Sequence, residues 1–309
     1  MQRVLTSVTL LGLLVATAAA FAITEHLKLI KSPVYGTLVS KELSPTCGCR
    51  ERRATIQIRL RHRDSVTVTI LDGGNHKVAT VASQVRVPPR RHFPFVWDGR
   101  DQTGAQAPDG VYYAEVHLAN AHRTIVLPNR IVLDTQTPKV LSASAAKPVL
   151  FAGPGRSVTI RYALSEQANA VVYLHGRQII RGRPTRLRYR VKWSGTLDGR
   201  PLRAGSYVLS VGARDAAGNE TPAAGRKDVT VALRYIEVEP GRLTVRAGGH
   251  LAVRVQTASS RYTWHLGRRH GARRGHRLNL TAPTTPGTYR LTVAEHGHFA
   301  TARVRVRAK

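Results

Sequence analysis

Arginine recurs at every second position in short stretches of this 309-residue chain, and that spacing is suited to binding anions. In an extended strand alternate side chains point to one face, so each stretch would present a row of cations. Arginine pairs bidentately with phosphate, sulfate or carboxylate groups. The candidate contacts for a polyanion are two such rows and one basic loop: Arg186, Arg188, Arg190 and Lys192; Arg303, Arg305 and Arg307; and Arg268, Arg269, Arg273, Arg274 and Arg277.

The charge of the chain is strongly positive and unevenly distributed. The 48 Lys and Arg residues outnumber 18 Asp and Glu residues, giving a net charge of +30. Residues 139–234 hold 17 basic against 5 acidic residues and residues 235–309 hold 14 against 3, but residues 51–138 hold 12 against 8. Such a field attracts polyanions and is weakened by salt. The alternative interpretation is that the rows are ordinary solvated faces of an arginine-rich protein.

Nothing in the sequence predicts specific reading of a nucleic acid, because no recognition helix, RNA-binding motif or zinc finger accompanies the basic rows. Enzymatic activity is not expected either. A nucleophile elbow, a phosphate-binding loop, a carboxylate pair and a catalytic Cys–His arrangement are all missing from the sequence. The acidic residues are scattered and several fall in turns, which is the ordinary place of aspartate.

Cys47 and Cys49 are the only cysteines, and a single glycine separates them. Outside the cytoplasm they would be oxidised. A local disulfide, a bridge to another molecule and weak metal binding are the three alternatives. Two thiols are too few for a structural zinc site, and the 13 histidines show no zinc-binding spacing. The sequence therefore predicts no metal and no cofactor.

The elements that would position these residues are β-strands. From residue 54 onward apolar residues alternate with polar ones, as in Ile56, Ile58 and Leu60 and again in Val66, Val68 and Ile70. This alternation is typical of half-buried strands. No long helical periodicity follows residue 30. The chain is therefore expected to be all-β and antiparallel.

A short phrase, Gly-x-Tyr, occurs three times and indicates how the strands are grouped. In the first two copies a Trp and a glycine-bearing turn precede it. A buried Trp fills a sandwich core, and the Tyr can bond to backbone at a sheet corner. The phrase predicts tandem Ig-like β-sandwiches, with a structural role for these residues: Trp97, Gly104, Gly110, Tyr112, Trp193, Gly199, Gly205, Tyr207, Gly287 and Tyr289.

The first 24 residues differ from the rest. Val4 to Ile23 is uncharged and long enough to span a bilayer, yet Ala20-Phe21-Ala22 has the form of a cleavage site. An uncleaved transmembrane anchor and a cleaved signal peptide are both open, and either places residues 25–309 outside the cytoplasm. The predicted organisation is residues 1–24 as anchor or signal, 25–50 as a stalk, and three Ig-like domains at 51–138, 139–234 and 235–309.

The stretch from Phe95 to Val116 resembles the Ig-like domain of FlgD, the flagellar hook-capping protein. The residues that carry the resemblance are Trp97-Asp98-Gly99, Gly104 and Gly110-Val111-Tyr112. It is looser over 139–234, and only Gly287-Thr288-Tyr289 remains in the last unit. The resemblance implies a bacterial extracytoplasmic protein. It does not imply hook assembly, because the N-terminus here is an apolar segment and not a flagellar export region.

The expected function follows from charge, fold class and resemblance together. We expect a non-enzymatic cell-envelope protein, membrane-anchored or secreted, that acts as a structural or adhesive module and contacts anionic polymer through its arginine rows. A hook-cap-like accessory protein of a flagellum or pilus is one alternative, and a non-catalytic carbohydrate-binding subunit is another. The membrane would be contacted through the N-terminal segment, and protein partners stay open.

Overall fold

The computed structural model describes residues 12–21, 32–182, 187–259 and 261–308. Residues 12–21 form an exposed helix, and the other regular elements that the structure describes are strands and two short 3-10 helices, Arg50–Arg52 and Ala223–Gly225. Among the described residues, none of the helices has the length and apolar character needed to span a membrane. The other residues of the predicted N-terminal segment lie outside the described ranges. The all-β, Ig-like prediction is confirmed.

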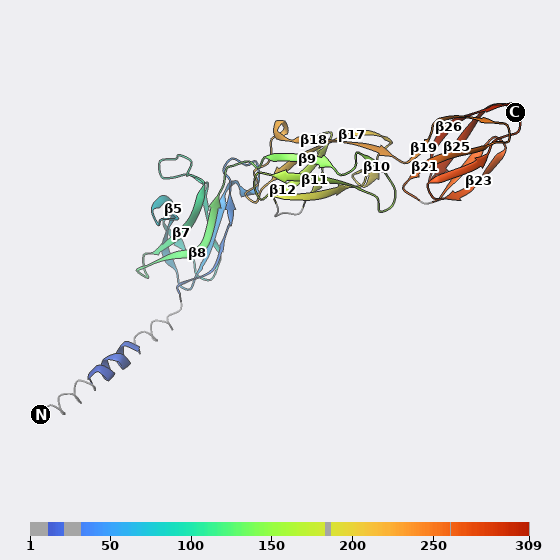
Figure 1. Ribbon diagram of the computed structural model, residues 1–309. Helices are drawn as coiled ribbons and strands as arrows, with labels where there is room; N and C mark the ends of the chain where they lie inside the picture. The colour runs from blue at the N-terminus through green and yellow to red at the C-terminus, as the bar shows by residue number, and fades with distance from the viewer. Residues whose placement is uncertain (1–11, 22–31, 183–186, 260, 309) are drawn as a thin grey trace. The chain divides into compact units, whose positions relative to one another are not determined.

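The chain divides into two compact units, Met1–Thr135 and Gln136–Lys309 (Figure 1). Among the residues that the structure describes, the first unit holds one hydrophobic cluster, within residues 34–133. The described residues of the second unit form two clusters, within residues 140–235 and 236–306. Each cluster lies in a sandwich of a three-stranded and a five-stranded sheet. We call these the first, second and third sandwich; the domain boundaries at 138/139 and 234/235 stay predictions.

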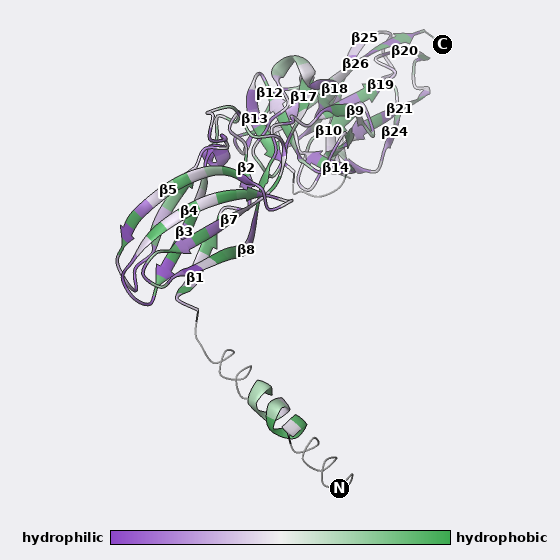
Figure 2. Cartoon of the chain, turned by 90° about the vertical axis from the view of Figure 1, so that its left-hand side faces the viewer, coloured by the Kyte–Doolittle hydropathy of each residue, from purple (hydrophilic) through white to green (hydrophobic). Residues whose placement is uncertain are grey.

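The first sandwich shows why the alternating pattern folds as it does. In β3 (Ala54–Leu60) every second side chain is buried and the side chains between them are partly exposed. Figure 2 shows the same alternation of hydrophobic and hydrophilic residues along the strands of this unit. The three-stranded sheet is ordered β1 (Val34–Val39), β3 (Ala54–Leu60), β6 (Phe93–Trp97). The five-stranded sheet is ordered β2 (Glu42–Leu43), β8 (Arg123–Leu133), β7 (Gly110–Leu118), β4 (Asp64–Asp72), β5 (Lys77–Val87).

The predicted stalk over residues 25–50 is wrong from residue 34 onward, where the chain belongs to the first sandwich. β1 pairs antiparallel with β3, and β2 pairs parallel with β8. Val34 and Leu43 are buried in the first hydrophobic cluster. The alternating pattern does not reveal β1 because the register shifts between Tyr35 and Leu38, where Gly36 adopts a positive φ of 57°. A bulge of this kind removes the period of two from the sequence.

The second sandwich has the same arrangement of sheets. Its three-stranded sheet is ordered β14 (Arg188–Trp193), β11 (Val158–Leu164), β9 (Val140–Ala145). Its five-stranded sheet is ordered β10 (Val149–Phe151), β18 (Lys227–Arg234), β17 (Gly205–Arg214), β12 (Asn169–Leu174), β13 (Arg177–Arg181). A small hairpin joins β15 (Thr196–Leu197) to β16 (Arg200–Pro201).

The third sandwich repeats the arrangement once more. Its three-stranded sheet is ordered β19 (Ile236–Glu239), β21 (His250–Thr257), β24 (Arg277–Thr281). Its five-stranded sheet is ordered β20 (Arg242–Arg246), β26 (His298–Arg307), β25 (Gly287–Glu295), β22 (Arg261–Leu266), β23 (Arg269–Arg274). Among the named strands, the predicted antiparallel pairing holds except at one end of the larger sheet of each sandwich, where the terminal strand runs parallel to its neighbour.

The Gly-x-Tyr phrase forms a sheet corner in each sandwich. The hydroxyl of Tyr112 donates to the carbonyl of Pro108 at 2.5 Å, and that of Tyr207 donates to Arg203 at 2.8 Å. The hydroxyl of Tyr289 donates in the same way, across the same four-residue separation, to Thr285 at 2.9 Å. Burial raises the pKa of Tyr112, and the nearby negative charges of Asp72 and Asp109 raise it further. Through these hydrogen bonds to carbonyl groups four residues earlier in the chain, the three tyrosines close local turns.

The tryptophans of the first two copies fill the cores beside these corners. The ring centroids of Trp97 and Tyr112 are 4.9 Å apart, and those of Trp193 and Tyr207 are 5.8 Å apart. Each indole N–H donates to the carbonyl three residues later, at 2.8 Å for Trp97 and 3.1 Å for Trp193. Packing and hydrogen bonding together make each Trp a fixed part of its sandwich.

Candidate anion-binding faces

The first predicted row lies on the outer face of the smaller sheet of the second sandwich. Arg188, Arg190 and Lys192 of β14 are exposed. Arg186 lies outside the described residues. The strand register adds a cation that the sequence did not indicate, because Arg161 of β11 is directly opposite Arg190. Four basic residues therefore share this face.

The apolar partners in this row differ from the expected pattern. Alternation predicts that Leu187, Tyr189, Val191 and Trp193 are all inward, but only Val191 and Trp193 are buried. Leu187 is 50% exposed and Tyr189 is 48% exposed. β14 is an edge strand, Leu187 precedes it, and Tyr189 is its second residue. A shallow groove of mixed polarity lies on this sheet, lined by Leu141, Ser142, Ser144, Arg161, Tyr162, Ala163, Arg188, Tyr189 and Arg190.

The second row lies on the larger sheet of the third sandwich and has more neighbours than the sequence indicated. Arg303, Arg305 and Arg307 of β26 are exposed, and the residues between them are buried. Parallel pairing places Arg242 of β20 beside Arg303, and Arg246 beside Arg307. Antiparallel pairing places Arg290 of β25 on the other side of Arg303. We call these six arginines on three adjacent strands the arginine face: Arg242, Arg246, Arg290, Arg303, Arg305 and Arg307.

The predicted basic loop is wrong for most of its length. Arg269, Arg273 and Arg274 belong to the strand β23, and Arg277 begins β24, while Arg268 lies in the turn before β23. β23 is an edge strand paired only with β22. Its sequence shows no apolar alternation, because five of its six residues are exposed. These arginines are therefore spread along an edge and are not gathered in one turn.

Little negative charge opposes either face. Within the parts of the chain that the structure describes, ion pairs between arginine and a carboxylate involve Arg100, Arg177 and Arg226, none of which is on these faces. Like charges directly opposite one another on neighbouring strands are mutually destabilising. A bound anion would relieve that repulsion, and arginine side chains can hold an oxyanion through charge-assisted hydrogen bonds.

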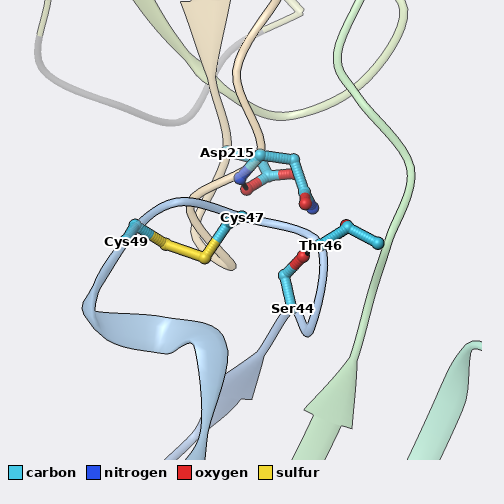
Figure 3. The surroundings of a disulfide bond; sticks show 6 residues. Ser44, Thr46, Cys47, Cys49 and Asp215 are labelled. Carbon is cyan, nitrogen blue, oxygen red and sulfur yellow. Dashed lines mark hydrogen bonds between the residues drawn. A yellow bond between two sulfur atoms is a disulfide. The ribbon is translucent and has the colours of Figure 1, made fainter. Parts of the chain in front are cut away.

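Cys47 and Cys49 are joined by a disulfide in the loop between β2 and the short 3-10 helix Arg50–Arg52 (Figure 3). Other contacts fix the same loop. The hydroxyls of Ser44 and Thr46 are 3.1 Å apart, and the N–H of Ser44 donates to the carbonyl of Glu51 at 2.9 Å. The disulfide therefore cross-links a segment that already belongs to the first sandwich.

Thiol labelling should reflect this bridge. We expect purified full-length protein, denatured without a reductant, to react with no equivalents of a thiol reagent, and to react with two after reduction, because the two cysteines are paired with each other. Mass spectrometry of a non-reducing digest would identify the peptide. Labelling of both thiols without reductant would contradict the disulfide between Cys47 and Cys49. A covalent dimer on a non-reducing gel would indicate an intermolecular disulfide instead.

Comparison with known proteins agrees with this architecture. The chain is a tandem Ig-like protein by its strand order and sandwiches. Residues 48–122 match the family model of the FlgD Ig-like domain, which confirms the resemblance seen in the sequence. Comparison with curated protein sequences gives no match.

Solved structures similar to the chain include multi-domain Ig-like and fibronectin-like fragments. The I-band fragment I67–I69 of titin is 13% identical over 90% of this chain and 99% of the fragment, with a TM-score of 0.31. Fibronectin(III)-like modules of CbhA from Clostridium thermocellum are 14% identical over 65% of this chain and 93% of theirs, with a TM-score of 0.34. A structure of a 1.5-MDa bacterial ice-binding adhesin is 14% identical over 90% of this chain and 99% of its own, with a TM-score of 0.25.

Proposed function

We propose that this chain is a non-enzymatic bacterial cell-envelope protein, a structural or adhesive module that binds anionic polymer through the basic faces of its second unit. The observation that supports this most directly is the arginine face, where strand pairing brings six exposed arginines together. Such a surface attracts polyanions over long distances and holds them by charge-assisted hydrogen bonds.

The proposed location is outside the cytoplasm. The Cys47–Cys49 disulfide supports it, because disulfides persist mainly in oxidising compartments. The uncharged segment from residue 4 to residue 23 supports it as well, since either an anchor or a cleaved leader would export the residues that follow. N-terminal sequencing by mass spectrometry of protein from the envelope fraction would distinguish an anchor from a leader.

Retention on an immobilised polyanion tests the proposed function. Full-length protein should bind dextran sulfate at low salt and elute as ionic strength rises, because counterion release makes such binding salt-dependent. The combined variant Arg188→Gln, Arg190→Gln, Arg303→Gln and Arg305→Gln should bind about tenfold more weakly, if each contact contributes a few tenths of a kcal/mol.

The matched control removes the same charge from the first unit: Arg86→Gln, Arg90→Gln, Arg91→Gln and Arg123→Gln, all exposed positions. We expect this variant to retain most of the affinity. Absence of retention, or retention unchanged between low and high salt, would overturn the proposed function. Equal losses in both variants would mean that net charge, and not the faces of the second unit, determines binding.

An accessory role in a flagellum or pilus is the second candidate, favoured by the family match over residues 48–122. Flagellar or pilus genes beside the gene for this chain, and co-purification with their subunits, would support it. A non-catalytic carbohydrate-binding role predicts retention on neutral glycans that salt does not abolish. The same columns, run with neutral and anionic polysaccharides, separate that role from the proposed one.

A further inference from the structure

The arginine face has the shape of a strip that runs along the strands, and we call it the strip below. Three of its members lie on β26, between Arg303 and Arg307, and two lie on β20. Four residues of strand span about 13 Å, while three neighbouring strands span only about 10 Å. The strip is therefore elongated in the direction in which β20 and β26 both run.

Two parallel rows of arginine run along the strip, one on β20 and one on β26. Because β20 and β26 are parallel and in register, Arg242 is paired with Arg303, and Arg246 with Arg307. Neighbouring strands are about 4.8 Å apart, so the guanidinium groups of a pair can approach one oxyanion from two sides. Without an anion, each pair brings two like charges together.

Hydroxyl groups occupy the positions between the two charged pairs. Thr244 lies beside Arg305 on one side, and Thr288 lies beside it on the other. Both threonines are exposed. Their hydroxyls can donate to an anionic oxygen held at Arg305. The strip thus offers a continuous line of donors over its whole length.

The strip has little to offer a lipid surface. Within the described part of the third sandwich, Phe299 is the one large hydrophobic residue that is strongly exposed, and it lies beyond the arginines at the start of β26. Binding of a protein at a membrane interface scales with buried apolar area as well as with charge. A narrow, polar strip is better matched to a chain than to a membrane.

We propose that a linear polymer carrying repeated phosphate or sulfate groups lies along β26, with its anionic groups between the arginine rows of β20 and β26. This inference rests on the proposed function and names the face and the class of ligand. A polymer is favoured over a small anion because one bound group raises the effective concentration of the next along the line.

The test compares two variants of the full-length protein that lose the same charge within the third sandwich. One is Arg303→Gln, Arg305→Gln and Arg307→Gln on the strip. The other is Arg268→Gln, Arg273→Gln and Arg274→Gln, at exposed positions in and beside β23. We expect the first variant to bind long-chain polyphosphate and dextran sulfate about tenfold more weakly and the second less than threefold. Circular dichroism should show that both variants are folded.

Two further measurements, competition by single ions and binding to vesicles, distinguish the possible ligands. Inorganic phosphate and sulfate, at the same concentration of anionic groups, should compete at least tenfold less well than the polymers, which separates a chain from single ions. Vesicles containing anionic lipid should bind more weakly than the polymers. Polymer binding that the two variants lose equally, single ions that compete as well as polymers, or preferential vesicle binding would each overturn the inference. In those cases salt-dependent binding by the unaltered protein would still support the proposed function, and its absence would overturn both.

Discussion

Replacing Trp97 with alanine should lower the free energy of unfolding of the first unit by about 3–5 kcal/mol, the largest loss we expect from one substitution. The side chain is 1% exposed and packs against Tyr112 with 4.9 Å between ring centroids. Its loss would leave a cavity and would also leave the carbonyl of Arg100 without the indole N–H that it accepts at 2.8 Å.

Hydrogen exchange along β4 and β7 measures this effect in the first unit alone. Val96→Ala is the matched control, since the neighbouring side chain points outward and is 49% exposed. We expect that control to change stability by no more than about 0.5 kcal/mol. A Trp97→Ala variant with the exchange protection of the control would contradict the assigned core position.

Gly99→Ala should lower the free energy of unfolding of the first unit by about 2–4 kcal/mol. The similar substitution Gly104→Ala should lower it by only about 1 kcal/mol. Both glycines have a positive φ, 81° and 85°, so both substitutions carry the same backbone strain. A Cβ atom at Gly99 would be 2.5 Å from Cγ of Pro45, whereas one at Gly104 would have no neighbour within 4 Å.

Urea unfolding of the two variants measures the difference in the free energy of unfolding. The cost of placing alanine at a positive φ is the same in both variants, so it cancels in the comparison. The second sandwich offers an independent repeat. A Cβ atom at Gly195 would be 2.6 Å from Cδ1 of Leu233, and one at Gly199 would again meet nothing within 4 Å. Equal losses within either pair would show that the crowding at Gly99 and Gly195 is relieved by movement of the neighbouring side chains.

Central and half-buried strands could be predicted from the sequence because their side chains alternate. The alternation of Ile56, Ile58 and Leu60 predicts a strand that the structure shows as β3, and that of Val66, Val68 and Ile70 predicts one that lies within β4. These apolar residues of both strands are buried in one core. The Gly-x-Tyr phrase was equally informative, since a sheet corner needs those residue types in a fixed local order.

The remaining elements could not be predicted because local pattern does not determine them. β1 contains a bulge, and β23 is an edge strand with almost no buried residue. The arginine face depends on pairing between β20 and β26, which lie about 60 residues apart in the sequence. Arg303 was identified as a candidate from its own strand, but the neighbours that complete the face become visible only with the register of three strands.

The parallel strand pairs have a mechanical consequence. When a chain is pulled from both ends, two parallel neighbours near the start and end of a sandwich are drawn past each other, so their hydrogen bonds carry the force together. The pairing covers two residue pairs in β2 and β8, three in β10 and β18, and five in β20 and β26. Under tension the first sandwich should yield before the third. A polymer held on β20 and β26 would therefore contact the longest of the three parallel strand pairs.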